Sequence, residues 1–209
     1  MSKSDTKNIK VQENAIIKAL QDFLLDIPTS RLSKSETPEA DAKKLVDEAS
    51  LKTGAISGLL AIPPGPLGVF TIIPDLISIW KIQAQLVADI SALYGKTAFL
   101  TKETMAFCLF KHGGMHLFKD IVIRAGERFL VKRTSLRVFQ KVISLIGIKI
   151  TQRVISKTIS RWVPIIGAVF VGFYSSLDTK EIGKNAIELM KSELSFQENG
   201  DDEDEKVAV

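Results

Sequence analysis

Residues 53–96 read TGAISGLLAIPPGPLGVFTIIPDLISIWKIQAQLVADISALYGK, and the predicted architecture depends on how this segment folds. Its first part, residues 54–74, holds no charged side chain and is long enough to cross a bilayer as one helix. One continuous helix is excluded, because each proline near the middle removes a backbone donor and clashes with the preceding turn. The helix-breaking residues are Pro63, Pro64, Gly65, Pro66 and Gly68. We therefore expect two apolar helical arms joined by a Pro/Gly elbow, which is either a buried hairpin or a re-entrant membrane element.

The two arms carry residues that bear on packing and on helix ends. Gly54 and Gly58 form a GxxxG pair, which lets a second helix backbone approach closely, in a membrane or inside a helical domain. Pro74 and Asp75 indicate a helix start, where the carboxylate would cap free amides. Asp75 could instead be a lone acid at membrane depth. Gly95 is the expected C-cap of this second helix.

A second uncharged segment, WVPIIGAVFVGFYSSL, covers residues 162–177. It is too short to span a bilayer comfortably, and Pro164 and Gly167 again interrupt it. We expect a second broken apolar hairpin that packs on the first. Asp178 would then cap a last helix, which turns its apolar positions inward.

The segment between the two elbows is strongly basic. Residues 111–161 carry a net charge of +10, whereas the rest of the chain carries −6. Residues 115–163 show apolar residues at helical spacing, which predicts a basic amphipathic helix of the kind that binds anionic membranes. A solvated surface helix would show the same pattern. The residues expected to contact a membrane or a partner are Lys141, Lys149, Arg153, Lys157, Arg161 and Trp162.

Composition and length define the class of protein. The chain has 209 residues, 45% of them hydrophobic, one cysteine and no apolar leader at its N-terminus. These values predict one domain on the cytosolic side of a membrane, without disulfides. We expect an all-α fold with two Pro/Gly-interrupted apolar hairpins over residues 11–195. Residues 1–10 and the acidic tail, 196–209, are expected to be disordered.

Catalytic and metal-binding patterns are weak. Cys108, His112, His116 and Asp120 recur at steps of four, but residues eight apart on a helix lie about 12 Å apart, too far for one ion. Gly113 and Gly114 are also expected to end the helix there. We expect no metal, no cofactor and no enzymatic activity.

Nucleic acid is not an expected partner either. The chain has no phosphate-binding glycine loop. Its basic residues alternate with aliphatic ones, and few aromatic side chains are available to stack on bases.

Two segments resemble the EcsC protein family. Residues 58–96, with PPGPLG, IIPDL and VADISALYGK, are similar to one conserved part of that family, and residues 163–190 are similar to its closing segment. The resemblance implies an all-helical protein associated with bacterial membranes, in a family named from an operon that also encodes an ABC transporter. It implies no enzymatic activity and no catalytic residues.

The sequence thus favours a membrane-associated, non-catalytic helical protein that binds anionic lipid. The alternative is a soluble helical adaptor whose basic face binds an acidic protein. Neither hypothesis defines the oligomeric state.

Overall fold

The computed structural model describes residues 3–60, 68–158 and 164–197. The fold is predominantly helical, as predicted, with 74% of the residues in helices. The helices are α1 (Lys3–Leu25), α2 (Pro38–Leu60), α3 (Gly68–Leu93), the short 3-10 helix η1 (Thr97–Phe99), α4 (Lys102–Phe118), α5 (Leu136–Thr158) and α6 (Pro164–Lys191). The strands are β1 (Val122–Ala125), β2 (Arg128–Lys132) and β3 (Glu193–Gln197).

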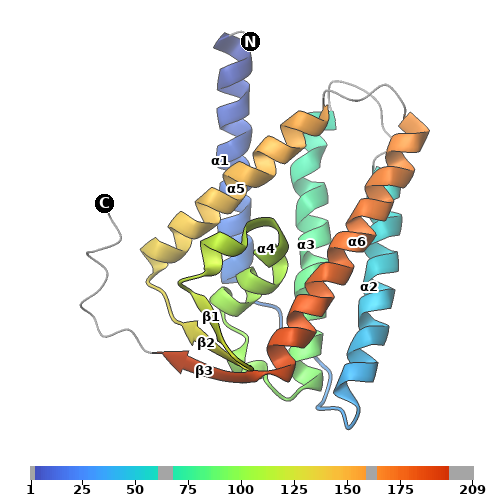
Figure 1. Ribbon diagram of the computed structural model, residues 1–209. Helices are drawn as coiled ribbons and strands as arrows, with labels where there is room; N and C mark the ends of the chain where they lie inside the picture. The colour runs from blue at the N-terminus through green and yellow to red at the C-terminus, as the bar shows by residue number, and fades with distance from the viewer. Residues whose placement is uncertain (1–2, 61–67, 159–163, 198–209) are drawn as a thin grey trace.

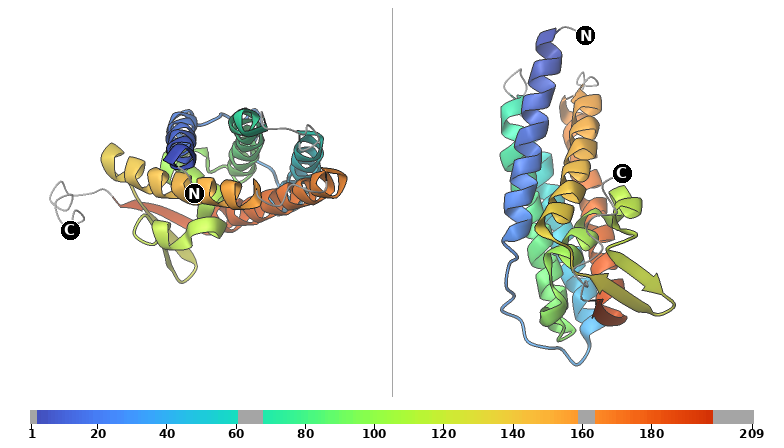
Figure 2. Two further views of the ribbon diagram at one scale, coloured as in Figure 1. Left: turned by 90° about the horizontal axis from the view of Figure 1, so that it is seen from above. Right: turned by 90° about the vertical axis from the view of Figure 1, so that its left-hand side faces the viewer.

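The long helices form two layers. Helices α1, α3 and α2 lie side by side in one layer. Helices α5 and α6 form the other layer, which crosses the first (Figures 1 and 2). Helix α4 lies between these layers in the lower half of the molecule and contacts α1, α3, α5 and α6. The small sheet closes the lower edge beside α4.

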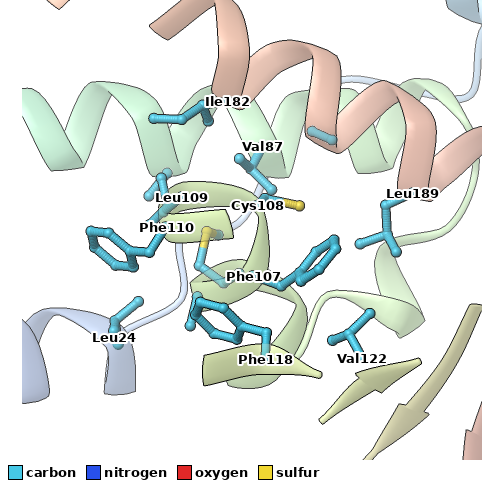
Figure 3. Close-up of a cluster of buried hydrophobic side chains, with 14 of the residues drawn as sticks. Leu24, Val87, Phe107, Cys108, Leu109, Phe110, Phe118, Val122, Ile182 and Leu189 are labelled. Atoms are coloured by element: carbon cyan, nitrogen blue, oxygen red, sulfur yellow. The ribbon is translucent and has the colours of Figure 1, made fainter. Parts of the chain in front are cut away.

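The core is centred on α4. Residues 103–110 are all buried, and Phe107 makes edge-to-face contacts with Phe118 of the same helix and Phe129 of β2 at 5.9 and 6.1 Å between ring centroids. Figure 3 shows these side chains between Leu24 of α1 and Ile182 of α6. One apolar core therefore joins α1, α4, α6 and the sheet.

Several helix features follow from the sequence. Ile16, Leu20 and Leu24 recur at steps of four, which predicts one inward helical face, and all three are buried on α1. Thr101 caps α4 by accepting a hydrogen bond from the backbone of Thr104. Gly95 has a positive φ of 65° after α3, which is the conformation that a glycine C-cap requires.

The predicted helix over residues 115–163 is wrong in its first half. Residues 122–132 form an antiparallel hairpin, and β3 adds to β2 in parallel. Burial alternates along β2, with Phe129 and Val131 inward, and Gly126 adopts a φ of 63° in the turn. A two-residue periodicity with a turn glycine is the signal of a hairpin, and it competes here with the helical spacing of the same residues.

Helix ends also differ from the prediction. Helix α1 begins at Lys3, so residues 3–10 are helical rather than disordered. Helix α4 continues through Gly113 and Gly114, since a glycine inside a helix costs only about 1 kcal/mol and packing can offset that cost.

Two predicted caps lie inside helices. Helix α3 begins at Gly68, so Asp75 is not at a helix start. The helix nevertheless passes through Pro74 in its second turn, where the proline removes one backbone hydrogen bond. Asp178 likewise lies in the middle of α6.

The second apolar segment is less broken than expected. Pro164 is the first residue of α6, the position at which proline is best tolerated. The helix then continues through Gly167 and Gly172 without interruption. Helix α5 ends at Thr158 and α6 begins at Pro164, so neither glycine forms the predicted break.

Candidate functional site

Four helix ends lie at one end of the molecule. These are Leu60 of α2, Gly68 of α3, Thr158 of α5 and Pro164 of α6 (Figure 1). Both views of Figure 2 agree with this placement. We call this region the apolar end, because the two uncharged segments of the sequence, residues 54–74 and 162–177, both reach it.

The predicted elbow residues divide between described and undescribed parts of the chain. Pro63, Pro64, Gly65 and Pro66 lie outside the described residues. Gly68 begins α3 and Pro164 begins α6, so both lie at the apolar end. Arg161 and Trp162 also lie outside the described residues.

The GxxxG pair makes a tight crossing between α2 and α6. A Cβ added at Gly172 would lie 2.7 Å from the carbonyl oxygen of Gly54 and 3.4 Å from Cα of Gly58. The glycines therefore allow the two backbones to touch, which confirms the interpretation of Gly54 and Gly58 as a packing site within the helical domain. The same crossing brings the two uncharged segments together.

An exposed apolar face extends from this crossing, and the sequence analysis missed it. Leu51 and Leu59 of α2 are 72% and 69% exposed, and Phe173 of α6 is 62% exposed; Tyr174 and Leu177 complete what we call the α2/α6 face. On two antiparallel helices these positions fall on the same side of the Gly54–Gly172 contact. The steps of four between Leu51, Ala55 and Leu59 could have indicated it. Exposed apolar patches of this kind mark binding surfaces for proteins or membranes.

The predicted basic residues do not form one cluster. Lys149, Arg153 and Lys157 lie on the part of α5 that approaches the apolar end, whereas Lys141 lies about 24 Å along the helix from Lys157. The Lys149 ammonium lies 2.9 Å from Nε2 of His116. Three of the predicted cations thus approach the apolar end on α5, and Lys141 does not.

The opposite end of the bundle is charged and paired. Glu39 forms ion pairs with Lys43 and Lys191, both at 2.8 Å, and Asp41 forms an ion pair with Lys44 at 3.2 Å. Hydrogen bonds from Lys191 and Lys43 lower the pKa of Glu39 to about 2. The end of the bundle opposite the apolar end is therefore polar, and the first turns of α1 project past the apolar end (Figure 1).

A polar network crosses the interior of the bundle. Gln83 of α3 is 1% exposed, and its Nε2 donates to Asp178 at 3.0 Å and to Thr179 at 3.1 Å. The hydroxyl of Thr179 lies 2.8 Å from that of Thr53, and Nε2 of His112 lies 2.7 Å from the carboxylate of Asp178. The network links α2, α3, α4 and α6. The two threonines and Gln83 are buried, whereas the side chains of His112 and Asp178 remain 28% and 29% exposed at the edge of the network.

The sulfur and imidazole groups are not brought together. Burial raises the pKa of the Cys108 thiol to about 12, and nearby Lys111 offsets this only in part. His112 pairs with Asp178, and His116 pairs with Lys149. Among the described residues, no three His, Cys, Asp or Glu side chains could share a metal ion.

One described helix is long and apolar enough to cross a membrane. It is the Leu76–Leu93 part of α3, and 56% of that segment is buried inside the protein. A helix buried to this extent is typical of the core helix of a compact fold.

Comparison of the chain with models of protein families, with characterised proteins and with solved structures found no match.

Proposed function

We propose that this protein is a non-catalytic, peripheral membrane protein of the cytosolic face that binds anionic lipid through its apolar end. The observation that supports the proposal is the meeting of three features there. The first uncharged segment comes from a distant part of the chain. It meets the second uncharged segment and the basic C-terminal half of α5, which adjoin each other in the sequence, at one end of the bundle.

The arrangement fits the physical chemistry of a membrane surface. Apolar groups gain free energy by entering the boundary between headgroups and acyl chains, and lysine or arginine side chains gain about 1 kcal/mol each near an anionic leaflet. The charged opposite end, with Glu39 and its two lysines, would remain in water. The exposed α2/α6 face would add apolar contact beside the apolar end.

The resemblance to the EcsC family supports the same proposal from the sequence. Residues 58–96, which carry the resemblance, contain most of the first uncharged segment and the whole of α3. A role beside a transport system in a bacterial membrane is what this resemblance implies.

Vesicle flotation with two matched triple variants tests the proposal. Lys149→Glu/Arg153→Glu/Lys157→Glu removes the bases near the apolar end, and Lys43→Glu/Lys44→Glu/Lys184→Glu makes the same change in net charge elsewhere. Three lysine or arginine contacts of about 1 kcal/mol each correspond to about 100-fold in affinity for anionic vesicles. We expect that loss in the first variant and less than threefold in the second.

Two results would contradict membrane binding at this end. One is an absence of flotation by the unmodified protein at about 0.15 M salt. The other is an equal loss of binding in both variants. Tryptophan emission gives an independent measurement, because Trp80 is already buried and Trp162 lies between α5 and α6. Emission should shift to the blue with anionic vesicles, and Trp162→Phe should abolish that shift.

A second candidate function rests on the other half of α5. Arg137 and Lys141 are exposed and lie away from the apolar end. These side chains support the alternative of an adaptor that binds an acidic protein. Retention of vesicle binding in an Arg137→Glu/Lys141→Glu variant would separate this function from lipid binding.

A further inference from the structure

A groove of about 700 Å³ lies between α1 and α3. Its lining includes Ala15 and Ala19 of α1 and Ala84 of α3, whose small side chains leave space between the two helices. Both helices run away from the apolar end in the same direction (Figure 1). The rings of Phe23 and Trp80 are in tilted contact, with 6.0 Å between their centroids, where the helices approach each other. Grooves of this size between helices are typical binding sites.

Charged side chains follow the groove. Lys18 and Asp22 lie four residues apart on α1, Asp26 follows directly after the last residue of that helix, and Lys81 lies on α3. All four are exposed, and none of them forms an ion pair with another described residue. An apolar seam flanked by unpaired charges is the pattern of a helix that receives a further helix.

The charges on α1 are self-complementary when two copies run antiparallel. In such a pair centred at the level of Leu20, residues equally far from the centre lie opposite each other, so Lys18 faces the partner's Asp22, and the reverse pair forms as well. Antiparallel pairing also aligns the two helix dipoles favourably.

We propose that the α1–α3 groove is a self-association site, in which α1 of a second copy of the chain lies antiparallel. The resulting dimer has two-fold symmetry, because each copy offers the same groove and the same helix. The first turns of α1 extend past the rest of the bundle (Figure 1), so this helix is accessible to a partner. The inference does not depend on membrane binding.

Charge reversal with rescue tests the pairing. Analytical ultracentrifugation of the full chain, without lipid, should show a monomer–dimer equilibrium. Lys18→Glu and Asp22→Lys should each weaken the dimer at least tenfold, because each places like charges at two symmetric positions. The double variant Lys18→Glu/Asp22→Lys restores opposite charges and should return to within threefold of the unmodified protein. Lys43→Glu and Asp47→Lys on α2 serve as matched controls without effect.

Filling the groove gives a second, steric measurement. Ala19→Trp should weaken the dimer at least tenfold while circular dichroism shows an unchanged helix content. A monomer at every concentration up to about 10⁻⁴ M would overturn the proposal. So would a double variant as weak as either single variant, since that result would assign the groove to another occupant, such as a foreign helix or a lipid chain.

Discussion

Gly172 sets the distance between α2 and α6. Alanine has the higher helix propensity, by about 1 kcal/mol, and would stabilise an unconstrained helix. Here its Cβ would lie 2.7 Å from a backbone oxygen of Gly54, which cannot move aside as a side chain can. The contact therefore explains why a glycine stands inside a long helix.

Gly172→Ala should lower the free energy of unfolding by about 1–3 kcal/mol, the usual cost of overpacking. Urea denaturation monitored by circular dichroism measures this change. Ala55→Val, on the exposed side of α2, is the control and should change stability by about 0.5 kcal/mol at most. A gain of stability in Gly172→Ala would show that the helices do not touch at this point.

Cys108 should be unreactive in the folded protein. Its thiol is fully buried and its pKa is raised to about 12, so almost no thiolate exists at pH 8. A colourimetric thiol reagent should label it only after denaturation. Lys43→Cys, which introduces an exposed thiol, should react within minutes in the native state, and equal rates for the two thiols would contradict the burial of Cys108.

Gln83 joins helix α3 to helix α6 through two hydrogen bonds. In Gln83→Leu the new side chain has a similar volume but no amide donor. Asp178 and Thr179 therefore each lose one hydrogen bond. We expect a loss of about 1–3 kcal/mol. Gln85→Leu on the same helix is the control: Gln85 bonds to Thr29 and Asp89 nearer the surface, so the loss should stay below about 1 kcal/mol. Equal losses would show that the buried network adds nothing.

The elements differed in how far the sequence predicted them. On α1 the apolar positions Ile16, Leu20 and Leu24 fit only a helical period, and the prediction was confirmed. Residues 121–132 fit both a helical and a two-residue period, so local pattern could not decide between helix and hairpin. Strand β3 depends on pairing with β2, whose partner residues are more than 60 positions away. Strand formation of this kind is decided by tertiary context.

The candidate site was predicted in its parts but not in its arrangement. The sequence identifies Lys149, Arg153, Lys157 and the two uncharged segments, because each is a local property of the chain. Their placement at one end depends on how α5 and α6 cross the α1–α3–α2 layer, which no local pattern specifies. The exposed Leu59 and Phe173 were missed because exposure depends on which helices leave a face uncovered.

Together, the proposed dimer and the proposed membrane site predict that the whole molecule can bridge two bilayers. Helix α1 runs away from the apolar end, so an antiparallel partner points its own apolar end in the opposite direction. One dimer can then bind two bilayers. Monomers of the same protein would bind only one.

Vesicle clustering tests this consequence. The unmodified protein should increase the hydrodynamic size of anionic vesicles in dynamic light scattering, with a maximum at intermediate protein-to-lipid ratio, because excess protein saturates each vesicle separately. Lys18→Glu should still float with vesicles but fail to cluster them, and Lys18→Glu/Asp22→Lys should cluster them again. Clustering by Lys18→Glu at the level of the unmodified protein would exclude the α1–α3 groove as the bridge. Flotation of the unmodified protein without any clustering would instead exclude the antiparallel arrangement of the dimer.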